Sequence, residues 1–304
     1  MALSQQKSST GSGVTNALAA YFMWGLAPIY FKLLIDIGAG EILMHRVVWS
    51  SVFLLLLVLL SKKRLVLMQL CKQPKVIAKL SLSAAVLAVN WLIFIWAINN
   101  NHLLDASLGY FINPLFNVAL GMIFFNERLR RNQKIAVVLA GFGVFVQLFT
   151  VGSLPLVSLV LASTFAIYGV LRKKMHVDSF VGLLIESLLM LPIAILYWLY
   201  FIDSSTADLT SNSASLNFTL IMAGIVTTAP LLCFTAAAKR LTLSSLGFFQ
   251  YIGPSIMFLL ATFYYKESMQ LAEFATFIFI WLALALYSID AYRTMKKTQI
   301  PNTQ

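Results

Sequence analysis

Long runs of apolar residues are the feature that most restricts how this chain can fold. A helix that crosses a membrane needs about 20 mostly apolar residues, and the 304-residue sequence contains ten such segments. They run over 14–34, 42–60, 78–98, 105–125, 134–150, 154–171, 180–202, 217–238, 244–265 and 272–291. Because ten segments of this length use about 200 residues, the sequence predicts an all-α polytopic membrane protein with ten transmembrane helices and no soluble domain.

The composition excludes the main soluble classes. Hydrophobic residues make up 60% of the chain and charged residues 11%, against roughly 45–50% and 25% in soluble domains. So few charges cannot cover a water-exposed surface, which argues against a soluble enzyme. The N-terminus lacks the layout of a cleaved signal peptide. Cys71 and Cys233 are isolated and offer no metal-ligand spacing, so we expect no metal and no cofactor.

The basic residues predict the orientation of the chain. On alternate loops, counted from the N-terminus, the sequence places 19 of its 22 Lys and Arg residues. The opposite loops hold only Lys32 and Lys266, and Arg46 lies inside a span. Since loops rich in Lys and Arg stay in the cytoplasm, we expect cytoplasmic tails at 1–13 and 292–304. The net charge of +11 then reflects topology and does not indicate a nucleic-acid partner.

One alternative to this count remains open. The short span at 134–150 runs almost directly into the span at 154–171. A single long helix over both segments would change the parity of the later loops.

An internal repeat relates the two halves of the chain. Glu127 follows Pro114 by thirteen residues, and Glu267 follows Pro254 by the same spacing. A shift of 140 residues links the two prolines and also carries Lys32 onto Arg172. We therefore expect a five-helix repeat over 14–150 and a second over 154–291. Because five is odd, the second repeat must be inverted, which is a common plan for secondary transporters.

These residues resemble a known family. The matching segments are Ser107–Arg131, with its Pro-to-Glu spacing, Gln133 and Gly141-Phe142-Gly143-Val144, which resemble the EamA module of the drug/metabolite transporter superfamily. The segments Glu41–Ser50 and Phe249–Pro254 resemble its RarD branch, and Trp24-Gly25 fits the same branch. After Glu267 the chain lacks the glycine-rich helix that follows Glu127, so its second half departs from the pattern.

The resemblance covers about the whole chain and has functional implications. It implies a permease of a bacterial-type cytoplasmic (inner) membrane that moves small drugs or metabolites. Members of this branch are described as chloramphenicol-sensitivity proteins, so the resemblance points to a chloramphenicol-related substrate class.

Two ionisable residues inside predicted spans are the first candidates for a transport site. Arg46 and Glu186 carry opposite charges and are related by the repeat shift of 140. A charge at the centre of a bilayer costs about 2.5–3.5 kcal/mol on insertion scales, so it normally faces a cavity or a partner. We predict that Arg46 and Glu186 form a substrate-reading or proton-coupled pair. The alternative is a structural ion pair. His45 is a second candidate for proton coupling, because histidine titrates near neutral pH.

A set of polar and aromatic residues in the spans predicts the rest of a substrate site. Such side chains supply hydrogen bonds and ring contacts to an amphipathic ligand, although hydrogen bonds between helices would use the same residues. The set consists of Trp24, Asn90, Trp91, Tyr110, Asn113, Gln250 and Tyr251. Pro114 and Pro254 lie within spans, where each removes a helix hydrogen bond, and we predict that they act as hinges.

Missing motifs narrow the function further. The sequence has no G-x-x-x-x-G-K-[ST] phosphate loop and no H-E-x-x-H or G-x-S-x-G motif, so we predict no catalytic residues. The sequence predicts a secondary active transporter that works by alternating access between its two repeats. Its expected partners are a small-molecule substrate, the lipid bilayer and protons as a candidate coupling ion. A membrane-embedded enzyme and a channel-like component are the alternatives.

Overall fold

The structure is a computed structural model that describes residues 2–99, 103–151, 156–201, 205–266 and 271–297. This part of the chain contains helices and no strands. The helices are α1 (Ala2–Lys32), α2 (Ala39–Leu60), α3 (Arg64–Cys71), α4 (Pro74–Asn99), α5 (Leu103–Phe125), α6 (Arg131–Val151), α7 (Leu156–Lys174), α8 (Ser179–Phe201), α9 (Ala214–Ala238), α10 (Leu243–Gln250), α11 (Ile252–Leu259) and α12 (Leu271–Lys297). A 3₁₀ turn, η1 (Ser205–Ala207), precedes α9, and a π-helical turn, η2 (Leu260–Tyr264), follows α11.

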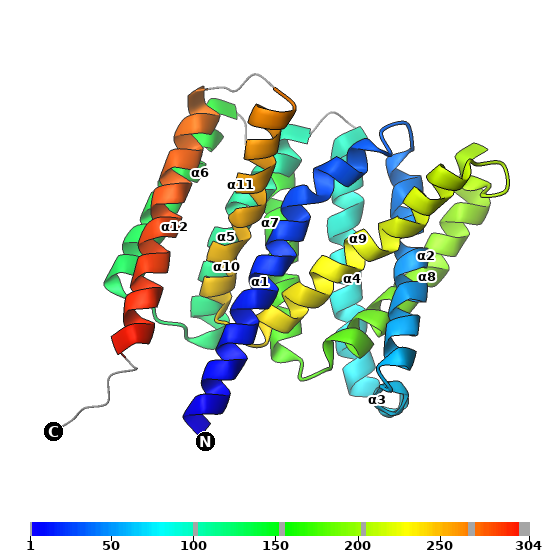
Figure 1. The fold of residues 1–304 in the computed structure, drawn as a ribbon, viewed down its shortest axis with the longest axis horizontal. Helices are drawn as coiled ribbons and strands as arrows, with labels where there is room; N and C mark the ends of the chain where they lie inside the picture. Colours follow the sequence, from blue (N-terminus) through cyan, green and yellow to red (C-terminus); the bar gives the residue numbers. More distant parts are fainter. Residues whose placement is uncertain (1, 100–102, 152–155, 202–204, 267–270, 298–304) are drawn as a thin grey trace.

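The long helices stand side by side in one bundle (Figure 1). Helices α6 and α12 pack together at one edge of the bundle, and α2 and α8 pack together at the other (Figure 1). Between these edges, α5 packs against α7 and α10, while α1 packs against α9 and α11. Helix α4 contacts both α7 and α8. Segments far apart in the sequence therefore form most of the interior surfaces.

Seven helices in the described part of the chain are long and apolar enough to cross a membrane, namely α2, α4, α7, α8, α9, the α10–η2 segment and α12. The other predicted spans correspond to α1, α5 and α6, which are also helical. Within the residues whose side chains are described, Gly109–Phe125 of α5 is a shorter apolar helix. The prediction of helices is confirmed, while the count of ten transmembrane helices remains a prediction.

The outer surface of the bundle is apolar, as a lipid-facing surface must be. Large hydrophobic side chains that point outward include Phe22, Leu56, Leu92, Val138, Phe145, Leu199 and Phe263. A soluble monomer rarely exposes such a continuous apolar area. Since a helix satisfies its own backbone hydrogen bonds, it is the element that can carry apolar side chains into lipid.

Several helices end or begin at defined local signals. Lys62, Asn126 and Lys266 adopt left-handed backbone angles, with φ of 55°, 51° and 54°. A left-handed residue directly after a helix stops its propagation. Ser213 and Thr242 begin α9 and α10, because their side chains accept hydrogen bonds from backbone N–H groups in the first turn.

Helices α6 and α7 are separate, so the single long helix is not formed. The end of α7 returns to the end of α5, since Lys174 Nζ lies 4.5 Å from the centre of the Phe124 ring. The chain therefore reverses direction between α6 and α7. Residues 152–155, between the two helices, lie outside the described residues.

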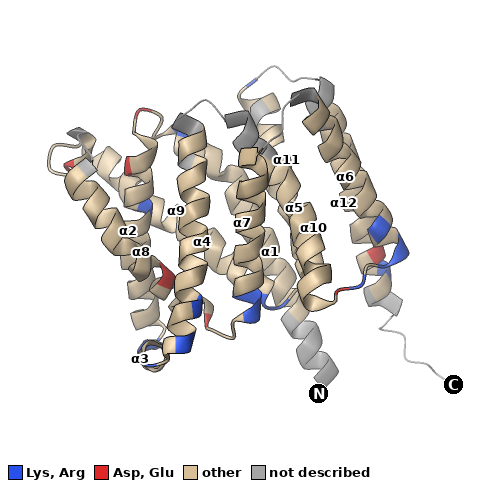
Figure 2. Cartoon of the chain, turned by 180° about the vertical axis from the view of Figure 1, so that it is seen from behind, with Lys and Arg blue, Asp and Glu red and all other residues tan. Residues whose placement is uncertain are grey.

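The predicted tails and loops contain more helix than expected. Helix α1 is helical from Ala2, and α12 continues to Lys297. The basic loop after α2 contains the short helix α3. Figure 2 shows Lys and Arg gathered at one end of the bundle, the end at which α1 begins and α12 ends. This gathering agrees with the alternation of basic loops along the sequence.

Gly224 allows α9 to cross α2 in direct backbone contact. A Cβ atom at position 224 would lie 2.4 Å from the carbonyl carbon of Trp49 and 2.7 Å from the nitrogen of Ser50. The Ser50 hydroxyl also donates a hydrogen bond to the Gly224 carbonyl, at 3.2 Å. This contact brings the polar residues of α9 next to those of α2.

Candidate functional site

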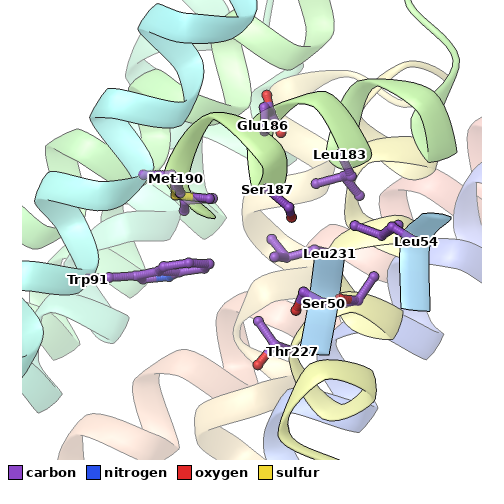
Figure 3. A pocket seen from close by; sticks show the side chains of 11 residues that line it. Ser50, Leu54, Trp91, Leu183, Glu186, Ser187, Met190, Thr227 and Leu231 are labelled. Atoms are coloured by element: carbon purple, nitrogen blue, oxygen red, sulfur yellow. The ribbon is translucent and has the colours of Figure 1, made fainter. Parts of the chain in front are cut away.

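A pocket lies between α2, α4, α8 and α9 inside the bundle (Figure 3). Its free volume is about 10 Å³, room for about one water molecule, so the four helices leave only a narrow space in this conformation. Its lining consists of Ser50, Leu54, Leu87, Trp91, Leu183, Glu186, Ser187, Met190, Thr227, Thr228 and Leu231. The walls are mainly apolar and include four hydroxyl residues. Glu186 also belongs to the lining, but its carboxyl end points away from Ser187 and Leu231 (Figure 3). A mainly apolar wall with a few polar groups is the usual character of a small-molecule site.

Helical periodicity explains why these residues line one space. On α8 the lining residues Leu183, Glu186, Ser187 and Met190 are spaced by three or four positions, so they share one face of the helix. The other three helices present their lining residues with the same helical spacing. The pocket is therefore formed where four helix faces meet.

Arg46 lies at the edge of this pocket. Its Nε donates a hydrogen bond of 2.8 Å to the Thr227 hydroxyl, and Thr227 lines the pocket. The guanidinium carbon lies 4.9 Å from the centre of the Trp91 ring and 5.8 Å from that of Phe31. Cation–π contacts of this kind stabilise a guanidinium that is partly removed from water.

Glu186 is buried at the pocket wall, and its partner is Arg172. Arg172 Nη1 donates to Glu186 Oε1 at 3.2 Å, and Ser83 Oγ donates to the same oxygen at 2.6 Å. The Tyr168 hydroxyl donates to Glu186 Oε2 at 3.3 Å. Arg172 and Glu186 form a salt bridge in which both side chains are almost fully buried, with exposures of 0% and 1%.

Arg46 and Glu186 therefore form no salt bridge with each other in the described part of the chain, and their role as a substrate-reading or proton-coupled pair stays a prediction. Glu186 lies within salt-bridge distance of Arg172, and Arg46 bonds to Thr227. The physical reason is that Arg172, the last-turn residue of α7, turns inward and supplies the nearer positive charge. The prediction that both residues face one interior region is compatible with the pocket, since Glu186 lines it and Arg46 contacts two of its lining residues.

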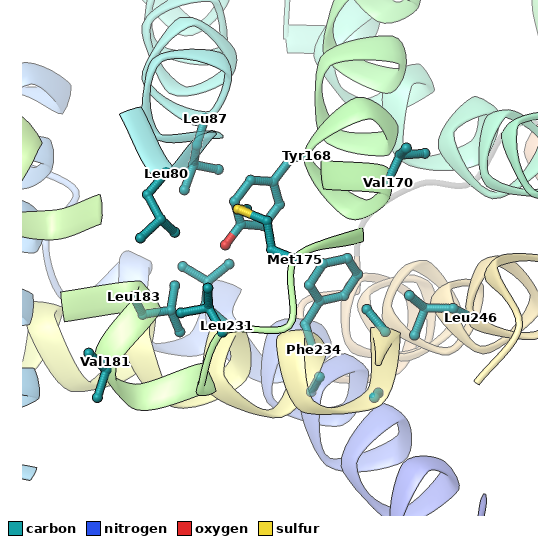
Figure 4. Packing of buried hydrophobic residues seen from close by; sticks show 14 of the residues in the cluster. Leu80, Leu87, Tyr168, Val170, Met175, Val181, Leu183, Leu231, Phe234 and Leu246 are labelled. Carbon is teal, nitrogen blue, oxygen red and sulfur yellow. The ribbon is translucent and has the colours of Figure 1, made fainter. Parts of the chain in front are cut away.

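The surroundings of the Arg172–Glu186 pair are apolar. Tyr168 stands among the buried side chains of Leu80, Leu87 and Met175 (Figure 4). Gly182 leaves room for the arginine, because a Cβ there would lie 2.6 Å from Arg172 Nη1. Arg172 Nε and Nη2 are buried without a hydrogen-bond partner in the described part of the chain. The pair depends on its mutual attraction, because water cannot replace a lost partner there.

The other predicted site residues lie outside the pocket, except for Trp91. Four of them form hydrogen bonds between helices. Asn90 donates to the Leu161 carbonyl at 2.9 Å and to Thr164 at 2.8 Å, and Asn113 donates to the Ala162 carbonyl at 2.7 Å. Gln250 accepts from Asn117 at 2.9 Å, and the Tyr251 hydroxyl donates to the Phe111 carbonyl at 3.3 Å. These contacts join α4 and α5 to α7, and α5 to α10.

Trp24 and Tyr110 have different surroundings. Trp24 packs in an aromatic cluster, with ring centres 5.6 Å from Tyr21, 5.9 Å from Phe165 and 5.9 Å from Phe234. Tyr110 is 42% exposed and packs edge-on against Phe94. Tyr110 does not belong to the lining of the pocket.

His45 directly precedes Arg46 in the sequence, is fully buried and faces α8. Its Nδ1 accepts a hydrogen bond of 3.2 Å from Trp49 Nε1, and its ring packs near Trp198 of α8. His45 Nε2 and Glu41 Oε2 are both buried without a partner in the described part of the chain. His45 therefore lies away from the residues that line the pocket.

The two prolines differ in their effect on the backbone. Helix α5 is continuous through Pro114. Near Pro254 the helix is interrupted at Tyr251, between α10 and α11. Proline cannot donate a hydrogen bond to the residue four positions earlier. The break precedes Pro254, whereas α5 tolerates the donor that is missing at Pro114. A hinge role for either residue remains a prediction.

Two further structural contacts lie at the basic end of the bundle. Glu127 accepts hydrogen bonds from the backbone nitrogens of Leu243 and Ser244 at 2.6 and 2.9 Å, which places its carboxylate at the positive N-terminus of α10. Lys239 donates to the Val177 carbonyl and to the Ser179 hydroxyl. Burial, together with the positive charge of Arg172, lowers the pKa of Lys239 to about 8.

The sequence analysis missed most of the residues that form the site. Ser83, Tyr168 and Arg172 were not recognised as partners of Glu186, and the hydroxyl groups of Ser50, Ser187, Thr227 and Thr228 were not noticed. Ser50 lies four residues after Arg46, and Ser187 directly follows Glu186, so a search around these two residues would have found both serines. No local pattern would have predicted that residues of α4, α7 and α9 belong to the site, because tertiary packing brings these helices there. Among the described residues no cluster of three or more His, Cys, Asp or Glu side chains could hold a metal ion.

Comparison with known proteins identifies the family. The family model described as "EamA-like transporter family" matches residues 11–149. Protein RarD of Escherichia coli (strain K12) is 54% identical over 289 residues, which cover 95% of this chain and 98% of that protein. The chain belongs to the EamA-like transporter family.

Other relatives agree with this assignment. An uncharacterized transporter of Vibrio cholerae is 50% identical over 96% of this chain and 97% of its own. The chloramphenicol-sensitive protein RarD of Pseudomonas aeruginosa is 34% identical over 95% of this chain and 97% of its own. The predicted resemblance to the RarD branch is confirmed. With its seven apolar helices, the chain is a multi-pass membrane transporter protein.

A solved structure supports the fold. A chain described only as "Crystal structure of protein" superposes with a TM-score of 0.74 over 93% of this chain and 99% of its own. The two sequences are 16% identical, so this likeness concerns the fold alone.

Proposed function

We propose that this protein is a secondary active transporter of small drugs or metabolites in the cytoplasmic (inner) membrane. It crosses the membrane ten times as two inverted five-helix repeats, keeps both termini in the cytoplasm and works by alternating access. The observation that carries the proposal is the interior pocket between α2, α4, α8 and α9, with apolar walls, hydroxyl groups and the buried carboxyl of Glu186. In a member of a transporter family, such a pocket is the expected place for a substrate.

The packing of the helices supports the two proposed repeats. The first would consist of α1, α2, α4, α5 and α6, and the second of α7, α8, α9, α10–η2 and α12. In this scheme α1 is equivalent to α7, α2 to α8 and α4 to α9. The contact of α1 with α9 then corresponds to the contact of α7 with α4, and the contact of α2 with α9 corresponds to that of α8 with α4. Exchanging equivalent helices leaves the α2–α8, α5–α10 and α6–α12 contacts unchanged. A pseudo-two-fold axis would produce this pattern.

The backbone adds independent support for the repeat. Asn126 and Lys266 both adopt left-handed angles, and they are 140 residues apart, the shift that also relates Pro114 to Pro254. Each directly precedes one of the paired glutamates, Glu127 and Glu267. Glu267 itself lies outside the described residues. Lys32 at the end of α1 packs on the Tyr265 ring, and Lys173 at the end of α7 packs on Phe125.

Glu186 is the proposed proton-coupling residue. Its carboxyl is buried at the pocket wall, and one protonation step would change both its bond to Arg172 and the charge of the pocket. Intramembrane carboxyl groups commonly mark substrate or proton pathways. His45 remains a weaker candidate, because its ring contacts lie on the side of α2 that packs against Trp198.

Counterflow in proteoliposomes tests the transport proposal. We expect purified protein to exchange labelled substrate in a saturable manner, and an imposed pH gradient to drive accumulation. The name of the Pseudomonas relative makes chloramphenicol the first compound to test, followed by amino acids and other small metabolites. Non-saturable flux would indicate a pore, and a chemical product would indicate an enzyme.

The Glu186→Gln variant tests the coupling role. We expect the folded protein to keep counterflow while its response to a pH gradient falls at least tenfold, because the amide cannot take up a proton. This change also leaves Arg172 without its ionic partner, so the amount of folded variant is measured and transport is normalised to it. Glu127→Gln is a matched control, since that carboxylate caps α10 away from the pocket. Transport by Glu186→Gln that responds to pH like the parent would remove Glu186 from the mechanism.

A further inference from the structure

The guanidinium of Arg46 carries a positive charge that no carboxylate balances within the described part of the chain. The salt bridges found there join Lys63 to Asp178, Arg130 to Asp290 and Arg172 to Glu186. Glu186, the carboxyl group of the pocket, is therefore already used by Arg172. Glu41 precedes Arg46 on α2, but its Oε1 accepts from Thr206 and its charge acts on His45.

The bonding capacity of Arg46 is largely unused. Only Nε donates a hydrogen bond in the described part of the chain, to Thr227. The two terminal nitrogens of the guanidinium form the planar fork that fits a carboxylate with two parallel hydrogen bonds. The Trp91 and Phe31 rings hold the group in position without offering it an anion.

The walls of the narrow pocket next to Arg46 are mainly apolar. Thr227 and Trp91 belong to the pocket and touch the guanidinium, so the charge and the cavity are contiguous. Leu54, Leu87, Leu231 and Met190 supply apolar walls, and Trp91 offers a ring face (Figure 3). A ligand that uses all these features would have an anionic end and a compact apolar or aromatic end.

We propose that the substrate is a small amphipathic carboxylate, whose carboxylate group binds Arg46 while its apolar body packs against the apolar walls of the pocket after the surrounding helices have moved apart. This inference rests on the proposed transport function and specifies the substrate class. Uncharged compounds of the same shape, and chloramphenicol, which is uncharged, would then bind more weakly, because they leave the Arg46 charge without a partner.

Ligand binding to purified protein tests the charge preference directly. The probes are isovalerate, phenylacetate and indole-3-acetate, each paired with its uncharged amide, and phenethylammonium as a cation of similar shape. Tryptophan fluorescence and the shift in melting temperature report binding. We expect at least one carboxylate to bind at least tenfold more tightly than its amide and the cation to bind least.

Variants of Arg46 test whether the preference for a carboxylate over its amide depends on this residue. Arg46→Gln should abolish the difference between carboxylate and amide. Arg46→Lys should keep part of it, because lysine retains the charge but loses the fork. Arg64→Gln removes an exposed charge at the start of α3 and should behave like the parent. Should Arg46→Gln not fold, the reduced but remaining preference of Arg46→Lys provides the test.

The outcomes separate this inference from the transport proposal. Equal or weaker binding of every carboxylate, or a preference that survives in Arg46→Gln, would overturn the inference. Saturable counterflow of uncharged compounds with no such preference would leave transport standing without it. An Arg46-dependent preference in a protein that catalyses no counterflow would support the anion site and reject the transporter.

Discussion

Arg46 and Arg172 both lie inside the bundle, but they differ in whether a carboxylate balances their charge. Arg172 is 1% exposed and forms a salt bridge with Glu186. Arg46 has a hydroxyl partner and two aromatic neighbours instead. In the sequence, Arg172 precedes Lys173 and Lys174 and is indistinguishable from a solvated topological charge. Arg46, isolated in an apolar segment, could be singled out, because no neighbouring residue explains it.

Removing Arg172 should strongly destabilise the protein. Arg172→Met leaves Glu186 buried without its ionic partner, which typically costs about 3–5 kcal/mol of unfolding free energy. Thermal unfolding in detergent measures the effect. The double variant Arg172→Met/Glu186→Gln should recover most of the loss, because the unpaired charge is then gone.

The adjacent Lys174→Met variant is the control for this prediction. Lys174 is exposed at the end of α7, and removing it should change stability by no more than about 0.5 kcal/mol. If Arg172→Met were as stable as Lys174→Met, the buried pair would not contribute to folding.

At the scale of elements, Asp178 joins the start of α8 to the end of α2. Its Oδ1 accepts from the backbone nitrogens of Phe180 and Val181 at 3.0 and 3.3 Å, and its Oδ2 bonds Lys63 at 2.6 Å. Burial raises the pKa of Asp178, but the hydrogen bonds from Lys63 and from the backbone outweigh this effect and lower the pKa below its ordinary value of 3.8.

The lowered pKa of Asp178 predicts how the stability of the fold depends on pH. Because the folded protein favours the charged form, Asp178 stabilises the fold above its ordinary pKa, and this contribution is lost as the pH falls through the lowered pKa. Asp178→Asn should therefore be less stable than the parent by about 1 kcal/mol at neutral pH, since the helix cap is weakened and the half-exposed ion pair adds little.

Melting curves between about pH 3 and pH 8 check this prediction. The difference between the parent and Asp178→Asn should be constant above about pH 5 and shrink below about pH 4. Lys63→Met, which keeps the cap, should lose less stability than Asp178→Asn at neutral pH. A difference that grows on acidification would contradict the assignment.

At the scale of the whole molecule, the proposed topology places the ends of the bundle on opposite sides of the membrane. The basic end contains α3, and the other end contains the segment around η1 that leads into α9 (Figure 1). Cys71, at the end of α3, is exposed. Ser215, in the first turn of α9, is also exposed.

Cysteine labelling in intact cells tests this orientation. With Cys71 and Cys233 replaced by serine, Ser215→Cys should react with a membrane-impermeant maleimide added from outside. A protein whose single cysteine is Cys71 should react only after the membrane is permeabilised. Equal labelling of both before permeabilisation would contradict the proposed topology and its cytoplasmic termini.

Sequence reasoning predicted the helices well because each helix is a local property. The predicted spans 42–60 and 180–202 correspond to α2 (Ala39–Leu60) and α8 (Ser179–Phe201) within three residues. It was less successful with the polar set. Asn90, Asn113, Gln250 and Tyr251 form hydrogen bonds between helices, and a polar residue in an apolar segment does not reveal whether its partner is a ligand or a neighbouring helix.

The sequence by itself determined the helical fold class and the family and selected Arg46 and Glu186 as candidates, because hydropathy, motifs and isolated charges can be recognised along one chain. Only the tertiary structure decided which partner each charge has. Arg172 turns inward to Glu186 across α7 and α8, and Thr227 of α9 reaches Arg46. These contacts join residues from different helices. The partners are set by how those helices pack, and no local sequence pattern encodes that packing.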